Sequence, residues 1–238
     1  MYWGFYLDPL YLLLLIAVLV ISGGSQLYIR KTFARWNAQP NGNRLTGMQV
    51  GQTLVDRIRF GSATGSATGI RFKEVPGDLS DHFDPRTREI GLSATVGRTA
   101  SVAAMAVVAH EVGHAQQHAE DTVAMKARSF LVPALAVSPT LSYLCIVFGL
   151  IFNIAGLFYL GILFFGVMVV FTLLTLPVEL GASRRAVVML RDARLLSSPQ
   201  EESAVKEVLR AAALTYVAAA VTSILQLLYY LSIANRRR

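Results

Sequence analysis

Long apolar stretches alternate with polar ones along this chain. Three stretches hold no Asp, Glu, Lys or Arg, namely residues 10–29, 130–178 and 211–234. A helix needs about 20 apolar residues to cross the hydrocarbon core of a membrane. The middle stretch of 49 residues is therefore long enough for two crossings, about 130–152 and 157–176, with a turn near Asn153. The pattern predicts four transmembrane helices.

The polar segments between these stretches predict which side of the membrane they occupy. Segments 30–128 and 178–210 are separated by two crossings, so they lie on the same side, and together they hold 19 of the 22 basic residues. Basic residues favour the cytoplasmic side. Met1–Asp8 has no basic residue and Arg30 follows the first stretch, which predicts an uncleaved anchor with its N-terminus outside. The basic tail 236–238 then lies outside, against the same tendency.

This reasoning gives five parts. They are an N-terminal anchor (1–29), a cytoplasmic metal-binding and catalytic region (30–128), a transmembrane hairpin (129–177) closed by Pro177, a cytoplasmic helix (178–210) and a C-terminal span with a basic tail (211–238). The expected fold class is mainly α, an integral membrane protein with a small cytoplasmic zincin-like α+β catalytic portion.

Local patterns predict the elements of the catalytic region. Thr46 and Gln49 form a capping-box pattern before a helix whose Val50, Leu54 and Ile58 point inward. Residues 61–68 repeat Gly-Ser-Ala-Thr and are typical of a flexible loop. Two strand-like runs, 70–75 and 88–93, flank a turn-rich centre and predict a β-hairpin. The hairpin either holds an extended peptide along its edge or only covers the neighbouring helix.

Composition supports a membrane protein and excludes other classes. Hydrophobic residues make up 54% and charged residues 16%, whereas soluble domains average about 25% charged residues. The net charge is +7, but the chain has no nucleic-acid motif or aromatic-interleaved basic patch, so we expect no nucleic-acid partner. Cys145 is the single cysteine, which excludes an intramolecular disulfide.

The motif His110-Glu111-Val112-Gly113-His114 ends an apolar run that begins at Ser101. The run predicts a helix capped by Thr99 or Ser101. Residues i and i+4 lie about 40° apart on a helix, so His110 and His114 can bind one metal ion from the same face. Glu111 lies beside them, where its carboxylate can take a proton from water on the metal. This pattern is typical of zinc hydrolases with one catalytic Zn²⁺.

Catalytic zinc usually has three protein ligands, and two residues compete for the third place. His118 lies eight residues after His110, about 12 Å along a straight helix, and no glycine breaks the helix between them. Glu179 follows the third span on the predicted cytoplasmic side, where a carboxylate so close to the membrane needs a partner. That partner is either the zinc ion or one of the two arginines Arg184 and Arg185. We expect Glu179 to be the ligand and Ser183, one turn further on, to hydrogen-bond a ligand.

The chain resembles the YugP-type membrane zinc metallopeptidases of bacteria. The resemblance lies in residues 74–77 (EVPG), 79–86 (LSDHFDPR), 92–93 (LS), 109–116 (AHEVGHAQ), 176–179 (LPVE) and 182–186 (ASRRA). The resemblance implies a membrane-embedded peptidase and strengthens the assignment of Glu179 as the third metal ligand. Phe83 replaces a usual tyrosine and Gly181 a common polar residue, so position 83 cannot supply a hydroxyl to stabilise an oxyanion.

The sequence therefore predicts a zinc endopeptidase in the bacterial inner membrane that cleaves membrane or membrane-proximal proteins or peptides at the cytoplasmic face. In this function Glu111 is the general base. The alternative is a membrane scaffold or adaptor with a structural or vestigial zinc site, and Glu111 argues against it because a structural site needs no base. The oxyanion donor is not assigned; His82, Arg184 and Tyr216 are candidates.

Overall fold

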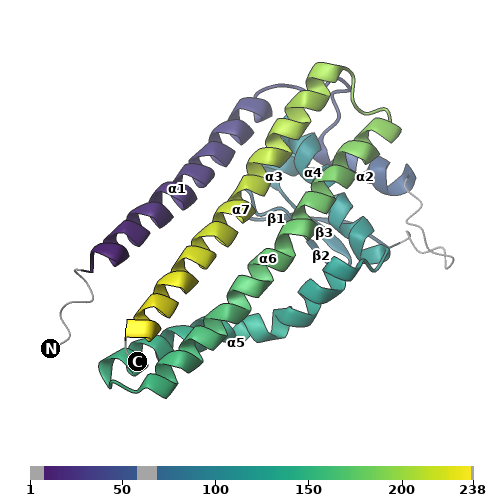
Figure 1. Ribbon diagram of the computed structural model, residues 1–238. Coiled ribbons are helices and arrows are strands. Elements are labelled where there is room, and N and C mark those ends of the chain that lie inside the picture. The colour runs from purple at the N-terminus through teal and green to yellow at the C-terminus, as the bar shows by residue number, and fades with distance from the viewer. Residues whose placement is uncertain (1–7, 58–68, 237–238) are drawn as a thin grey trace. The chain divides into compact units, whose positions relative to one another are not determined.

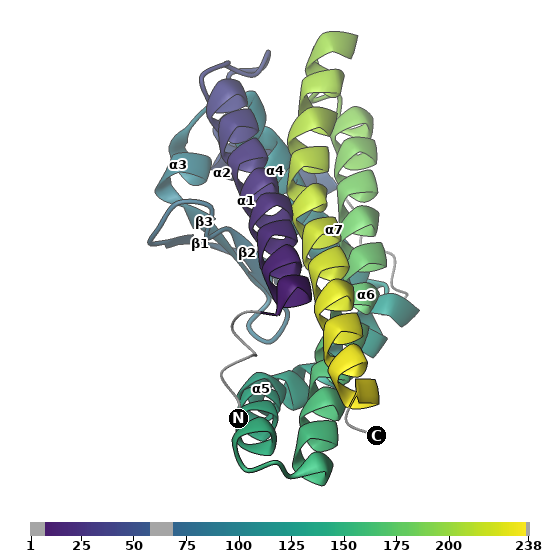
Figure 2. The same ribbon diagram turned by 60° about the vertical axis from the view of Figure 1, so that its left-hand side comes forward.

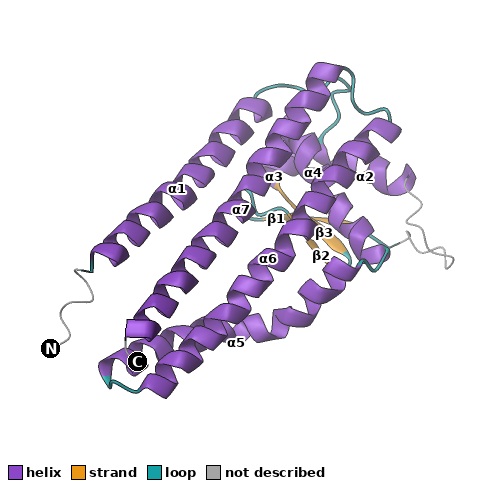
Figure 3. Ribbon diagram, viewed as in Figure 1, coloured by secondary structure: helices purple, strands orange, loops and turns teal. Residues whose placement is uncertain are grey.

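The computed structural model describes residues 8–57 and 69–236 (Figure 1). The chain divides into two compact units. We call residues 1–26, 126–176 and 215–238 the span unit, and residues 27–125 and 177–214 the mixed unit. Helices dominate both units, and the strands belong to the mixed unit (Figure 3). Four helices, α1, α5, α6 and α7, contribute residues to both units.

Among the described residues, four helices are long and apolar enough to cross a membrane, which agrees with the number predicted from the sequence. They are α1 (Pro9–Asn37), α5 (Val123–Ile151), α6 (Ala155–Asp192) and α7 (Pro199–Arg236). Large apolar side chains lie exposed on them, such as Leu19 at 63% and Leu163 at 65%. Such exposure would be costly in water but suits contact with lipid.

Helices α5 and α6 meet at the turn predicted from the sequence. Asn153, in this turn, has a left-handed φ of 55°, a conformation that asparagine tolerates better than most residues. Close packing follows the turn, because a Cβ on Gly161 would lie 2.6 Å from the Ile146 side chain. Small residues allow helices in membranes to approach closely in this way.

Pro177 lies inside a helix, whereas the sequence predicts that the third span closes there and that 178–210 forms one separate helix. Helix α6 continues through it to Asp192, and a turn at 193–198 leads into α7, so residues 178–210 belong to two helices. Proline removes one backbone hydrogen bond. Here the packed face continues beyond it, because Val178, Ala182 and Ala186 are fully buried at four-residue spacing. That burial holds the segment helical.

In the mixed unit, α2 (Gly47–Arg57) begins with the predicted capping box. The Thr46 backbone N–H donates to Gln49 Oε1 over 2.9 Å, and the Gln49 N–H donates to Thr46 Oγ1 over 3.3 Å. Val50 and Leu54 are buried as expected. The expected inward position of Ile58 and the predicted loop at 61–68 lie outside the described residues.

The predicted hairpin of 70–75 with 88–93 is wrong. Strands β1 (Arg71–Val75) and β3 (Glu89–Ser93) pair in parallel, and β2 (His82–Asp84) pairs antiparallel with the other side of β3. The sheet order is β1-β3-β2 (Figure 2). The 13 residues between β1 and β3 include a strand of their own, so the chain crosses to the far edge and returns through a turn at 85–88. The free edges therefore belong to β1 and β2.

Helix α4 (Val102–Ala119) is the centre of the mixed unit. It begins after Ser101, one of the two predicted caps, whose hydroxyl accepts from the Ala104 N–H over 3.0 Å. A short helix, α3 (Ala94–Arg98), precedes it and is capped in the same way by Ser93. Almost every residue of α4 up to Ala115 is buried. A helix buried on nearly all sides holds its side chains in fixed positions.

Candidate metal centre

Helix α4 carries both histidines of the motif on one face. The rings of His110 and His114 meet edge to face with centroids 4.6 Å apart, and their Nε2 atoms are 3.1 Å apart. His114 is 8% exposed and His110 is half-buried. The i, i+4 spacing thus turns two imidazole nitrogens toward one point, as the sequence predicts.

Helix α6 brings Glu179 to that same point. Its Oε2 atom lies 3.2 Å from His110 Nε2 and 3.3 Å from His114 Nε2. Glu179 is 2% exposed, so the carboxylate is removed from bulk water. Among the described residues, these three form the one group of at least three His, Cys, Asp or Glu side chains close enough to share a metal ion.

The three atoms have the spacing that zinc requires. Zinc binds histidine nitrogen at about 2.0–2.1 Å and carboxylate oxygen at about 2.0–2.2 Å, with tetrahedral angles. Ligands at those distances are about 3.3–3.4 Å from one another. The observed separations of 3.1, 3.2 and 3.3 Å form a nearly equilateral triangle of this size. The donor set fits one zinc ion with a fourth position left for water or substrate.

Two further side chains orient the histidine rings. The amide nitrogen of Gln117 donates to the Val178 carbonyl over 2.8 Å, which directs its Oε1 toward His114 Nδ1, 3.1 Å away. An oxygen acceptor there requires a proton on His114 Nδ1, so Nε2 keeps its lone pair for the metal. Ser183 Oγ lies 3.2 Å from His110 Nδ1, the kind of contact expected from the sequence.

Glu111 directly follows His110 on α4, and its side chain is buried. It is 7% exposed, and no described residue hydrogen-bonds its side chain. Burial raises the pKa of Glu111 to about 7, opposed by the His110 ring and reinforced by the negative charges of Glu179 and Asp81. A carboxyl in this range can take up and release a proton near neutral pH.

Glu179 has the opposite electrostatic character. Burial alone raises the pKa of this carboxyl, but the adjacent His110 and His114 rings lower it more, and the net pKa lies well below its usual range. Two carboxyls on adjacent helices thus have pKa values displaced in opposite directions. Such a separation is typical of sites in which one acid stays ionised while the other exchanges a proton.

The other sequence candidates do not belong to this group of metal-competent residues. His118 packs its ring against Phe83, with centroids 5.8 Å apart, and does not belong to the metal-competent group. His82 is exposed, and its Nδ1 lies 2.8 Å from the Ser80 carbonyl. Tyr216 belongs to the span unit. The oxyanion candidates His82, Arg184 and Tyr216 stay unassigned.

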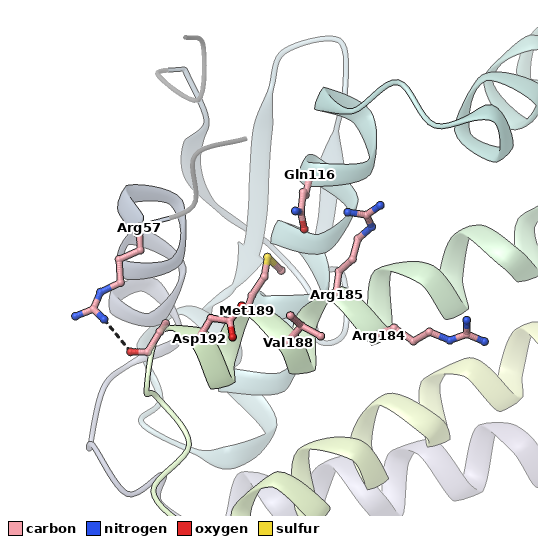
Figure 4. A pocket seen from close by; sticks show the side chains of 8 residues that line it. Arg57, Gln116, Arg184, Arg185, Val188, Met189 and Asp192 are labelled. Carbon is pink, nitrogen blue, oxygen red and sulfur yellow. Dashed lines mark hydrogen bonds between the residues drawn. The ribbon is translucent and has the colours of Figure 1, made fainter. Parts of the chain in front are cut away.

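Arg184 lines a pocket of about 480 Å³ formed by α2, α4 and α6 (Figure 4). Arg57, Gln116 and Asp192 also line it, and Arg57 donates to the Ala193 carbonyl over 2.9 Å. The three metal-competent residues do not line this pocket. Two of its lining residues are next in the chain to residues that contact the histidines. Gln116 precedes Gln117, and Arg184 follows Ser183.

Sequence reasoning missed two residues that build the site, Gln117 and Gly113. A Cβ on Gly113 would lie 2.7 Å from the Ala182 carbonyl oxygen, which is backbone of α6. Glycine at this point lets α6 approach α4 closely enough for Glu179 to reach the histidines. A small residue between the two histidines is the sequence signal that could have indicated a helix crossing.

Gly113→Ala should destabilise the protein by about 1–3 kcal/mol, the usual cost of overpacking, and weaken zinc binding because α6 must move away. Helix propensity alone predicts the reverse, a gain of about 1 kcal/mol. Gly97→Ala is the matched control, since its new Cβ would lie 3.6 Å from Leu92 in ordinary contact. Thermal unfolding and zinc titration in detergent measure both variants. A stabilised Gly113→Ala variant with normal zinc affinity would contradict this packing.

Comparison with known proteins places this chain in a family. Residues 11–235 match the model of a family described as "Putative neutral zinc metallopeptidase". The chain is also 34% identical over 224 residues to the Bacillus subtilis (strain 168) protein named "Putative membrane protease YugP", covering 94% of this chain and 96% of that protein. No solved structure matches the chain. The chain belongs to the family described as "Putative neutral zinc metallopeptidase".

Proposed function

We propose that this protein is a membrane-bound, zinc-dependent endopeptidase that cleaves membrane or membrane-proximal proteins at the cytoplasmic face of the bacterial inner membrane. One observation carries the proposal. The triangle of His110 Nε2, His114 Nε2 and Glu179 Oε2 fits one zinc ion, and the buried Glu111 follows the first ligand directly. The matched family and the four apolar helices support it.

Each side chain of the site has a task in peptide hydrolysis. The zinc ion would be held by His110, His114 and Glu179. When bound, it would act as a Lewis acid on the scissile carbonyl. The Glu111 carboxylate accepts a proton from the attacking water and returns it to the leaving amine. Gln117 and Ser183 keep the histidine rings in the orientation that presents Nε2. Burial of Glu111 keeps bulk water from competing for its proton.

The free edge of β2 is a suitable place for an extended substrate peptide. β2 packs against α4, and the charge of His82 on this strand influences the pKa of Glu111. Backbone pairing with an edge strand holds a peptide extended without selecting its side chains. This arrangement suits proteins or peptides as substrates, with sequence preference determined elsewhere in the site.

The scaffold alternative fits the site less well. Structural zinc sites usually have four protein ligands, whereas three metal-competent groups gather among the described residues. A purely structural site also gives no reason for a buried carboxyl beside the ligands, where burial is costly. The geometry therefore favours catalysis.

Metal removal tests the requirement for zinc. Protein purified in detergent should contain one zinc per chain and should cleave casein or itself. Chelation should abolish cleavage, and addition of zinc should restore it, because the three side chains that would bind zinc remain in place. Circular dichroism before and after chelation controls for unfolding. Cleavage that persists in protein shown to be free of metal would contradict the proposal.

Labelling of single cysteines tests the proposed side of the membrane. In a Cys145→Ser background, Thr87→Cys and Gln200→Cys should react only with reagents that reach the cytoplasm, while Asn153→Cys should react from outside. The distribution of basic residues predicts this result. Thr87, Gln200 and Asn153 are all exposed. Labelling of Thr87→Cys and Gln200→Cys from opposite sides would contradict the predicted topology.

A further inference from the structure

A second pocket, of about 440 Å³, lies between α6 and α7 within the mixed unit. We call it the α6–α7 pocket. Leu180, Val187, Val188 and Leu209 form its apolar wall. Leu180 and Val188 are 39% and 49% exposed, so this wall is open to a ligand. An apolar wall of this kind can accept hydrocarbon from a ligand.

Four cations also line the α6–α7 pocket, and two carboxylates near Arg191, those of Glu202 and Asp192, offset them in part. Arg184, Arg191, Lys206 and Arg210 are the cations. Arg191 and Lys206 share Glu202, at 2.7 and 2.6 Å from its Oε1. Arg184 and Arg210 are exposed and have no acidic partner among the described residues. The pocket thus carries a local excess of about two positive charges, which suits an anionic ligand.

The chain position of the α6–α7 pocket connects it with lipid. Leu180 is four residues beyond Leu176, the last α6 residue of the span unit, and Ala213 is two residues before Thr215, where α7 joins that unit. Both helices carry apolar segments suited to crossing a membrane. Basic pockets at the ends of such segments are well placed for the phosphate of an anionic lipid.

We propose that the α6–α7 pocket binds one anionic phospholipid. Arg184 and Arg210 hold the phosphate, the Arg191–Lys206–Glu202 cluster adds net positive charge, and the first acyl carbons lie against Leu180 and Val187. The pocket also includes Ser183, which contacts His110. A bound lipid therefore adjoins the candidate metal centre. The binding site does not depend on the proposed peptidase activity.

Lipid binding to purified protein in detergent tests this site by native mass spectrometry. Wild type should bind phosphatidylglycerol in preference to phosphatidylcholine. The double variant Arg184→Gln/Arg210→Gln should bind phosphatidylglycerol about 25-fold more weakly, about fivefold for each lost charge near a headgroup. The matched control Arg44→Gln/Arg88→Gln removes two other exposed arginines outside the pocket and should bind like wild type.

Three outcomes would overturn the proposal. Wild-type affinity in the Arg184→Gln/Arg210→Gln variant would show that the pocket does not hold the lipid. An equal loss in the Arg44→Gln/Arg88→Gln control would show attraction to surface charge in general. Binding of glycerol phosphate as tight as that of phosphatidylglycerol would show that the apolar wall makes no contact and that the ligand is a free phosphate. Zinc content and gel-filtration profile verify that each variant is folded.

Discussion

Replacing Glu179 with alanine is expected to lower zinc affinity by well over 100-fold. Loss of a residue that only orients a ligand typically costs 10–100-fold, and Glu179 is placed as a ligand itself, 3.2 and 3.3 Å from the two histidine nitrogens. The variant keeps two histidines, which bind zinc far more weakly than three ligands. Zinc titration of the detergent-purified protein measures the effect.

His118→Ala is the control for that experiment. His118 lies on the same helix but packs against Phe83 and stays outside the metal-competent group, so its removal should leave zinc content and activity near wild type. Circular dichroism is needed for the Glu179→Ala variant, because a misfolded α6 would also lose zinc. Zinc lost from His118→Ala and kept by folded Glu179→Ala would contradict the ligand assignment.

The sequence was informative wherever function and structure depend on neighbours along the chain. Apolar stretches of 20 residues or more are enough to predict the four described helices that are long and apolar enough to cross a membrane. The Thr46–Gln49 capping box and the Ser101 cap involve residues three apart, so local pattern identifies them. The spacing of His110 and His114 fixes their common face for the same reason.

Strand direction and helix continuity could not be predicted in this way. The alternating pattern of 70–75 and 88–93 indicates strands but says nothing of whether they run parallel, and β2 is only three residues long. Pro177 is a strong local signal for a helix end. The burial of Val178, Ala182 and Ala186 outweighs it, and that burial depends on packing against segments distant in sequence.

Gln117 and Gly113 show the same limit within the site. Gln117 orients His114 only because its amide also reaches the Val178 carbonyl, 61 positions away. Gly113 matters only because Ala182 lies opposite it. Glu179 was within reach of sequence reasoning because a carboxylate near an apolar stretch needs a partner, although the residues alone could not separate zinc from arginine as that partner.

The second prediction with a large expected effect concerns Glu111, the proposed general base. Glu111→Gln keeps the size and burial of the side chain but cannot accept a proton, so turnover should fall by at least ~100-fold. Zinc should stay bound, because His110, His114 and Glu179 are unchanged and Glu111 is not among the grouped ligands. This pairing of retained metal and lost turnover separates a catalytic role from a structural one.

Zinc content and casein cleavage, measured together on wild type and Glu111→Gln purified in the same detergent, test the peptidase function most directly. We predict about one zinc per chain in both proteins and cleavage only in wild type. Equal cleavage by zinc-loaded Glu111→Gln would contradict the account, since the buried carboxylate would then have no part in the reaction.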